Sequence, residues 1–137
     1  MKMKTNFNDF ILNEEIKMSK IAKKLVYNDY IIYIGKNAKM NDILTFDIAK
    51  PDDIWLHASG VPGSHVVIKV KNNEEPSKDI IKKAAEMALI NSRANGKTKI
   101  VWTKRKNVKK YSDHNDGQVN VDYKKSKFIT LNKNDYI

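Results

Sequence analysis

A glycine-containing loop carries the residues whose types could do chemistry in this chain. Gly63, Ser64 and His65 follow one another at its end, and His57 lies shortly before it. Such a loop could present backbone N–H groups and a hydroxyl to a phosphate. Its histidines could stack on a base or hydrogen-bond to a 2′-hydroxyl. The alternative is a plain turn with structural histidines, which we favour for His57; for Ser64 and His65 we favour contact with a ligand.

Positive charge is concentrated in a second region. Residues 78–110 hold 11 basic side chains against Asp79 and Glu86, a net charge of +9, whereas residues 1–77 and 111–137 have net charges of +1 and zero. A general bias towards lysine would scatter this charge along the chain. Because lysine and arginine neutralise phosphates, the concentration predicts nucleic-acid binding. The predicted contacts are Arg93, Lys104, Arg105, Lys106, Lys109 and Lys110.

Catalysis is disfavoured, although Asp53, His57, Ser59, Ser64 and His65 include every residue type of a Ser-His-Asp triad. Triad members normally converge from separate parts of a fold, and the chain has no nucleophile elbow, P-loop or dinucleotide fingerprint. The absence of cysteine excludes disulfides, thiolate catalysis and cysteine-ligated zinc. The three histidines lack the spacing of a metal motif. We therefore predict a non-enzymatic protein without metal or cofactor.

Two strands, over residues 54–58 and 65–70, are expected to position the loop. Side chains alternate between the faces of a sheet, so Trp55 and His57 share one face. A shift of one residue in the pairing of the strands would exchange the faces. The sequence leaves open whether His57 meets His65.

The remaining patterns predict an α+β fold. We expect a single compact domain with a mostly antiparallel sheet, packed by one long helix over residues 77–95 and a shorter helix over residues 37–49. Ser77 and Gly96 are suitable caps for the long helix. Further strands are expected over residues 24–27, 30–34, 99–105, 118–123 and 127–131, the first two and the last two as hairpins. Trp102 alternates with Ile100 and is expected in the core.

Residues 1–24 have apolar positions at roughly helical spacing and form a predicted N-terminal helical extension, with residues 25–137 as the domain. The extension could dock on its own domain, which we favour, or bind a partner protein. No signal peptide or membrane-spanning run is apparent. We therefore expect a cytoplasmic protein without a membrane partner.

The sequence D-I-W-L-H-A-S-G-V-P-G-S-H-V-V-I-K at residues 53–69 resembles the signature of the NFACT-R domain, the RNA-associated domain of ribosome quality-control proteins. The resemblance continues in G-K-N-A-K-M-N-D-I-L-T-F at residues 35–46 and covers about residues 25–131. It implies that Lys36, Asn37 and Asn41 help to build a binding surface. Capping and turn hydrogen bonds are the alternative for the two asparagines. Lys36 and Met40 stand where the family often has Arg and Gln, so Lys36 lacks Arg's planar fork.

The resemblance implies an RNA-binding module, which we expect to be stand-alone and non-catalytic. We expect it to engage tRNA or rRNA at the stalled large ribosomal subunit. A protein-interaction adaptor acting through residues 1–24 is one alternative. A DNA-binding module using the same basic face is the other.

Overall fold

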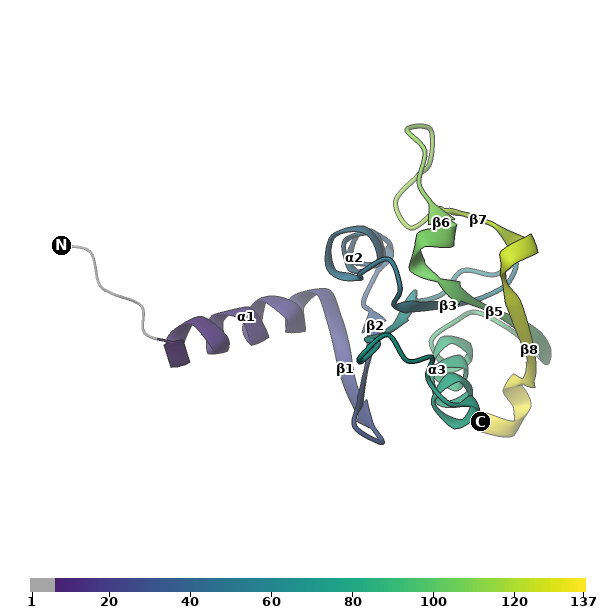
Figure 1. Cartoon of the computed structure of the whole chain (residues 1–137). Helices are drawn as coiled ribbons and strands as arrows, with labels where there is room; N and C mark the ends of the chain where they lie inside the picture. Colours follow the sequence, from purple (N-terminus) through teal and green to yellow (C-terminus); the bar gives the residue numbers. More distant parts are fainter. Residues whose placement is uncertain (1–6) are drawn as a thin grey trace.

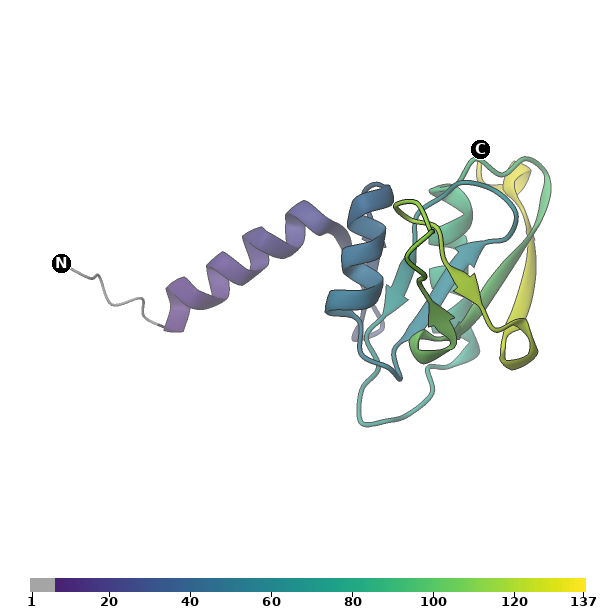
Figure 2. The ribbon, with the colours of Figure 1, turned by 90° about the horizontal axis from the view of Figure 1, so that it is seen from above.

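The computed structural model describes residues 7–137. The first element is a helix, α1 (Phe7–Ile21), which runs directly into the first strand, β1 (Ala22–Tyr27). Helix α1 extends away from the rest of the molecule (Figure 1 and Figure 2). Residues 1–6 of the predicted extension lie outside the described residues.

A six-stranded sheet in the order β1-β2-β4-β3-β5-β8 forms the centre of the domain. Every neighbouring pair is antiparallel. The other five strands are β2 (Tyr30–Gly35), β3 (Ile54–Ala58), β4 (Val66–Ile68), β5 (Lys97–Lys104) and β8 (Lys127–Asn132). The predicted α+β fold is confirmed.

The first hairpin is also as predicted. Asn28 and Asp29 connect β1 to β2 with φ values of 47° and 66°. Two positive values suit the twist of a two-residue hairpin turn, and Asn and Asp tolerate them better than most residues.

Two cores lie on opposite faces of the sheet. On one face, Ile32, Leu56 and Ile100 pack against α3 (Lys78–Ile90), which buries six of its own apolar side chains there. On the other face, Trp55 and Val67 are covered by the segment after β2 and by a small hairpin from later in the chain. The alternation of side chains along each strand supplies both cores.

The long helix begins where predicted and ends earlier. The Ser77 side chain caps it by accepting a hydrogen bond from the Ile80 N–H at 3.4 Å. The helix ends at Ile90, because the following residues form an isolated bridge between Ser92 and Gly63. The prediction that it continues to residue 95 is wrong. Gly96, with a φ of 69°, turns the chain into β5 and caps no helix.

The predicted helix over residues 37–49 forms in two parts. It begins as α2 (Ala38–Asp42) and widens into a π-helix over Ile43–Ile48. Asn37 is its N-cap and accepts a hydrogen bond from the Met40 N–H at 2.9 Å. The buried residues Leu44 and Thr45 of the π-helix face the second core. The segment ends at Ala49, before Pro51.

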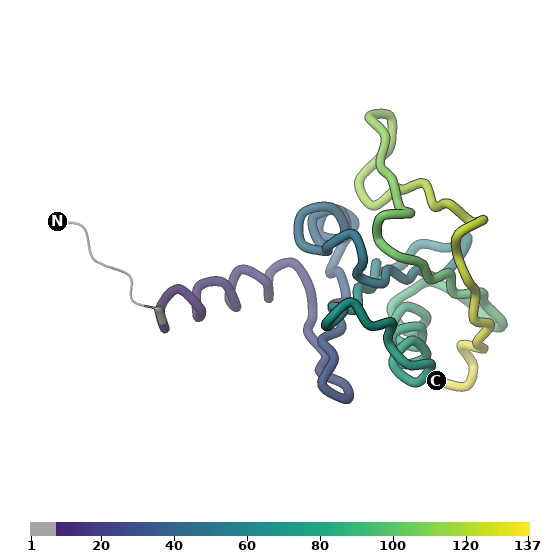
Figure 3. Tube along the Cα trace, in the orientation of Figure 1, coloured from purple at the N-terminus to yellow at the C-terminus, as the bar shows by residue number. Residues whose placement is uncertain are grey.

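The predicted hairpin of residues 118–123 with 127–131 is wrong. Strand β7 (Asn120–Val121) pairs with β6 (Val108–Lys109), and β8 pairs with β5. Val108 and Val121 are both buried in the second core, which holds this small hairpin over the sheet. The chain between β6 and β7 rises from that face and returns (Figure 3).

The expectation that the N-terminal helix docks on its own domain holds only for its C-terminal end. Phe10, Leu12 and Ile16 of α1 are exposed. The end of the helix packs on the domain through Met18 and the buried Ile21, and Ile11 lines a hollow together with Tyr33 of β2. Trp102 is half-buried against the α3 core, as predicted, with the Lys127 Nζ atom 5.1 Å from its ring centre.

Candidate nucleic-acid interface

The pairing of β3 with β4 resolves whether the two histidines meet. Trp55 pairs with Val67 and Leu56 with Val66, so His57 and His65 lie on the same face of the sheet. Their ring centres are 5.5 Å apart in an edge-to-face arrangement. His57 also stacks on Trp55 at 5.8 Å. The three rings form one cluster at the end of the two strands.

His65 lies at the base of this cluster and is 1% exposed. Its Nδ1 atom is 2.8 Å from the Thr45 hydroxyl, and its Nε2 atom is 3.1 Å from the Gly117 carbonyl oxygen. Because a carbonyl can only accept, Nε2 carries the proton and the Thr45 hydroxyl donates to Nδ1. Burial, aided by the neighbouring His57, lowers the pKa of His65 to about 3. The ring is therefore neutral at physiological pH.

Asn41 fixes the loop from the side of α2. Its Oδ1 atom accepts from the His65 N–H at 3.1 Å, and its Nδ2 atom donates to the Gly63 carbonyl at 3.4 Å. The amide packs directly on Gly35, where an added Cβ would lie 1.9 Å from Oδ1. The Asn41 amide thus fills the space that a side chain at residue 35 would need, so this packing requires a glycine there.

Gly63 is required by a close approach to the chain after α3. An added Cβ would lie 2.7 Å from the Cβ of Ser92. The Ser64 N–H donates to the Asn91 carbonyl at 3.0 Å, and the His65 N–H is bonded to Asn41. These two N–H groups point inward, so the predicted anion-binding loop of free N–H groups does not form at this point.

The loop, the start of α2 and the segment after α3 together enclose a hollow of about 580 Å³, here called the loop pocket. Seven predicted site residues line it: Lys36, Asn37, Asn41, His57, Gly63, Ser64 and Arg93. Lys36 and Arg93 are exposed, and neither has an ion-pair partner within residues 7–137. Asp116 and Gly117 complete the lining. The pocket therefore has basic groups at its surface and a hydrogen-bonded floor.

His57 is the half-buried ring of the cluster and lines the loop pocket. Burial lowers its pKa below the usual value, while a hydrogen bond with the Gly63 backbone acts in the opposite direction. The side chain is therefore a neutral ring that is partly open to the pocket. This intermediate position fits both the structural and the ligand-binding interpretation of His57.

The basic segment, Lys104–Lys110, begins at the opposite end of β3, where Lys104 pairs with Ile54. Lys104 and Lys106 lie 3.7 and 3.5 Å from the Asp52 carboxylate in exposed ion pairs. Arg105 is built into the fold instead: its Nε atom donates to the Thr45 carbonyl at 2.8 Å, and its guanidinium lies 4.9 Å from the Phe46 ring centre. Lys109 is exposed.

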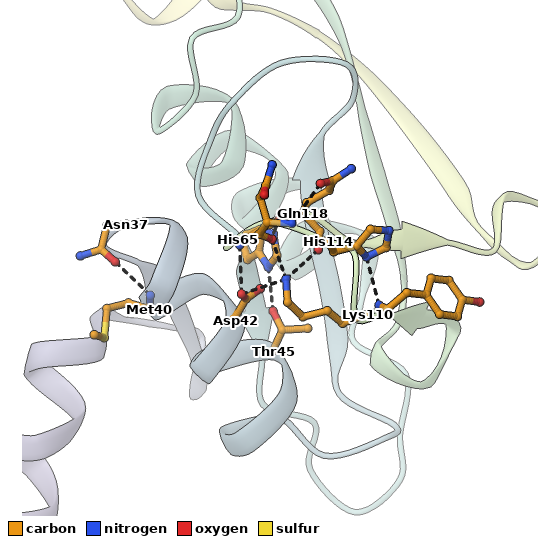
Figure 4. A network of polar contacts seen from close by, with 11 residues as sticks. Asn37, Met40, Asp42, Thr45, His65, Lys110, His114 and Gln118 are labelled. Atoms are coloured by element: carbon orange, nitrogen blue, oxygen red, sulfur yellow. Dashed lines mark hydrogen bonds and ion pairs between the residues drawn. The ribbon is translucent and has the colours of Figure 1, made fainter.

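Lys110 holds the loop between β6 and β7 onto the domain (Figure 4). Its Nζ atom lies 3.0 Å from the Asp42 carboxylate and donates to the carbonyls of Asn115 and Gln118 at 2.7 and 3.0 Å. Asp42 also accepts from the Gly117 N–H at 3.0 Å. This network places the Gly117 carbonyl over His65. Lys110 therefore has a structural task that its position in a basic run does not reveal.

Sequence reasoning missed the residues that support the site. Asp42, Thr45 and Gly117 hold Lys110 and His65 in place, yet each belongs to a segment predicted only as helix or loop. It also missed Tyr123 and the two lysines after it, which line a second hollow with Lys106 and Lys109. Two adjacent lysines after an aromatic residue were the available signal.

No three His, Asp or Glu side chains in residues 7–137 are grouped as metal ligands. Within the same part of the chain, none of the helices is long and apolar enough to cross a membrane.

Comparison with known proteins places this geometry in a family. The NFACT protein RNA binding domain matches residues 21–122. The Rqc2 homolog RqcH of Bacillus subtilis is 39% identical over 101 residues, covering 72% of this chain and 17% of that protein. The Rqc2 homolog RqcH of Streptococcus suis is 48% identical over 64 residues, covering 47% of this chain and 11% of that protein.

Two further similar proteins have names other than RqcH. Coiled-coil domain-containing protein 25 of Mus musculus is 29% identical over 111 residues, which cover 76% of this chain and 53% of that protein. The solved C-terminal structure of the fibronectin/fibrinogen-binding protein of Streptococcus suis superposes with a TM-score of 0.68 at 33% identity, covering 81% of this chain and 44% of that one. The chain spans less than a fifth of the length of the RqcH relatives. It belongs to the family of NFACT protein RNA binding domains.

Proposed function

We propose that this chain binds structured RNA, tRNA or rRNA, on the large ribosomal subunit in ribosome-associated quality control. The family description and the RqcH relatives support this assignment. The observation that carries it is the loop pocket, where seven separately predicted residues converge and two exposed cations have no partner in the part of the chain described.

In this proposal the exposed groups of the loop pocket contact the RNA. Lys36 and Arg93 bind phosphates, since charge-assisted hydrogen bonds to phosphate are strong. The Ser64 hydroxyl and the half-exposed His57 ring face the ribose and base. Asn37 caps α2 beside them. Asn41, Gly63 and His65 act as positioning residues, because their polar groups are engaged within the protein.

The basic segment supplies the salt-dependent part of the affinity. Lys104 and Lys106 share only exposed ion pairs with Asp52. Such pairs contribute little to stability, so a phosphate can replace the carboxylate. Lys109 is exposed without an ion pair in residues 7–137. Arg105 and Lys110 contribute through long-range charge while they hold the fold.

The proposed role is non-catalytic. Both ring nitrogens of His65 are occupied, so this ring has no free position for proton transfer. The Asp53 carboxylate accepts hydrogen bonds from the Lys50 and Val70 N–H groups and pairs with Lys69. Asp53 therefore stabilises the start of β3 locally and orients neither histidine.

The test compares RNA binding of the wild type with that of Lys36→Gln/Arg93→Gln. Fluorescence anisotropy with tRNA and co-sedimentation with large ribosomal subunits should both show weakened binding. Lys78→Gln/Lys82→Gln, which removes the same charge from α3, is the matched control and should change binding less. An equal loss of RNA affinity in both variants would show that the loop pocket contributes only non-specific electrostatic attraction. Equal affinity for DNA of the same length would favour the DNA-binding alternative.

A second candidate function is a protein-interaction adaptor acting through α1. The observation in its favour is the exposed apolar surface of Phe10, Leu12 and Ile16 on a helix that leaves the domain. Nuclease treatment separates the two functions. A complex that survives nuclease and is lost in Leu12→Asp/Ile16→Asp would support the adaptor.

A further inference from the structure

A second hollow, of about 630 Å³, lies beside the small β6–β7 hairpin. We propose that it is a binding site for unpaired RNA bases. It is called the aromatic pocket here, and the residues that matter in it are Lys106, Lys109, Tyr111, Tyr123, Lys124 and Lys125. This inference rests on the proposed RNA binding and adds a class of ligand to it.

The first observation is the gathering of exposed aromatic rings. Tyr123 is 56% exposed and Phe128 45%, and their rings lie almost parallel, at 10°, with centres 6.1 Å apart. Tyr111, 50% exposed, lines the aromatic pocket together with Tyr123, and Phe128 stacks on Tyr123 from outside the lining. Burial of an aromatic ring is normally favourable, so a stacked pair left in solvent is unusual. Parallel exposed rings are the platform on which single-stranded nucleic acids stack their bases.

The second observation is the charge around these rings. Lys109, Lys124 and Lys125 are exposed and have no ion pair within residues 7–137. The Lys99 Nζ atom lies 6.0 Å from the Phe128 ring centre. An apolar partner would leave these ammonium groups without compensation, whereas the phosphates that flank a stacked base neutralise them. Rings and cations together thus select a polyanion with flat apolar groups.

The third observation is that the platform is held in place. Asp122 donates its N–H to the Asn107 carbonyl at 2.9 Å and accepts from the Lys124 N–H through its side chain at 3.2 Å. The Ser126 hydroxyl donates to the Asp122 carbonyl at 2.7 Å, and the Thr103 hydroxyl donates to the Lys125 carbonyl at 3.2 Å. A turn ordered before binding costs less entropy when the ligand arrives.

Part of the site lies outside the family match. The family match ends at residue 122, so Tyr123, Lys124, Lys125 and Phe128 lie beyond it. Lys106 and Lys109, by contrast, belong to the basic segment as well as to the aromatic pocket. A single-stranded RNA segment that extends from a structured RNA along the basic segment would therefore reach the rings of Tyr123 and Phe128.

The experiment measures binding of a short oligouridine and of a duplex RNA with the same number of phosphates. In Tyr123→Leu/Phe128→Leu the affinity for oligouridine should fall about tenfold, since stacking of one base is lost. Affinity for the duplex and the salt dependence of both should stay unchanged, because no charge is removed. Tyr123→Phe should bind normally, and Phe10→Leu, an equally exposed ring on α1, is the matched control.

Lys124→Gln/Lys125→Gln provides a second arm that leaves the rings intact. It should reduce the salt dependence for both RNAs. Unchanged oligouridine affinity in Tyr123→Leu/Phe128→Leu, with wild-type duplex binding intact, would overturn the aromatic pocket and leave the proposed function standing. Absence of binding of either RNA to the wild type would overturn both. Preference for an acidic peptide over oligouridine, lost in the leucine variant, would assign the surface to a protein partner.

Discussion

The Nε2 atom of His65 donates to the carbonyl oxygen of Gly117 at 3.1 Å, joining the end of the glycine loop to a segment 52 residues later in the chain. The Thr45 hydroxyl, which belongs to the π-helix, donates to the other ring nitrogen, Nδ1. One imidazole thus ties together three segments that are distant in sequence. These hydrogen bonds link the loop pocket to the second core, on the face of the sheet that carries Trp55 and Val67.

Replacement of His65 should therefore act on stability first. His65→Ala removes a buried ring and leaves the Thr45 hydroxyl and the Gly117 carbonyl without partners. We expect a loss of about 2–4 kcal/mol in the free energy of unfolding, measured with urea. Hydrogen exchange should rise in the segment around Gly117. His114→Ala, which alters a more exposed ring, should cost far less, and similar losses in both variants would contradict a special role for His65.

The stability of the protein should also depend on pH through this ring. The folded-state pKa of His65 is lowered to about 3 from an ordinary value of 6.5. Above pH 6.5 neither state is protonated at this ring, so the ring adds no slope. As the pH falls through 6.5, the unfolded chain binds a proton that the native ring refuses, and stability decreases. At pH 5 the loss from this ring is about 2 kcal/mol.

Urea unfolding without RNA, at several pH values between 7 and 4, measures this effect. His65→Gln should flatten the difference between pH 7 and pH 5 relative to the wild type. If the pH dependence is the same in both proteins, other groups are responsible for it.

Gly35 and Asn41 should be energetically coupled. A methyl group at residue 35 would collide with the Asn41 side chain, since an added Cβ lies 1.9 Å from Oδ1. Gly35→Ala should cost about 1–3 kcal/mol in the wild type. In the Asn41→Ala background the clash with the amide is removed and only the Asn41 Cα, 3.3 Å from the added Cβ, stays close, so the same change should cost at least about 1 kcal/mol less. Additive effects in a double-mutant cycle would show that the amide can move aside.

How much of this site the sequence predicts depends on the range of the contacts. Local signals gave the Asn28–Asp29 hairpin and the Ser77 cap correctly, because turn and cap chemistry is decided within a few residues. The resemblance implied Lys36 and Asn41, and the local residue types indicated Gly63 and Arg93, but neither signal predicted that these residues converge on one pocket. The burial of His65 could not be predicted, because its partners Thr45 and Gly117 come from tertiary contacts.

Two of the predictions that the structure corrects have the same physical origin. Strand β7 pairs with β6 because Val108 and Val121 are buried together over the sheet, which no local pattern indicates. Helix α1 has apolar residues at helical spacing, but its N-terminal part projects from the domain and leaves Phe10, Leu12 and Ile16 exposed. An apolar stripe predicts that a helix will be covered and does not identify what covers it.

Adjacent lysines should behave differently. Lys109→Gln removes an exposed cation and should lower the slope of log affinity for RNA against log salt by about 0.7–0.9. Its free energy of unfolding should change by less than about 0.5 kcal/mol. Lys110→Gln breaks the contacts with Asp42 and two carbonyls and should cost about 1–2 kcal/mol in stability. Identical behaviour of the two variants would argue against the structural task of Lys110.

The direct passage from α1 into β1 has a mechanical consequence. Ile21 ends the helix and Ala22 begins the strand, so no linker separates them. The 15 residues of α1 form a rod about 22 Å long that continues from the sheet. A partner bound near Phe10 would therefore be held at a fixed distance and orientation relative to the sheet and the loop pocket. A rotation of the sheet would therefore move a partner bound to this helix along an arc.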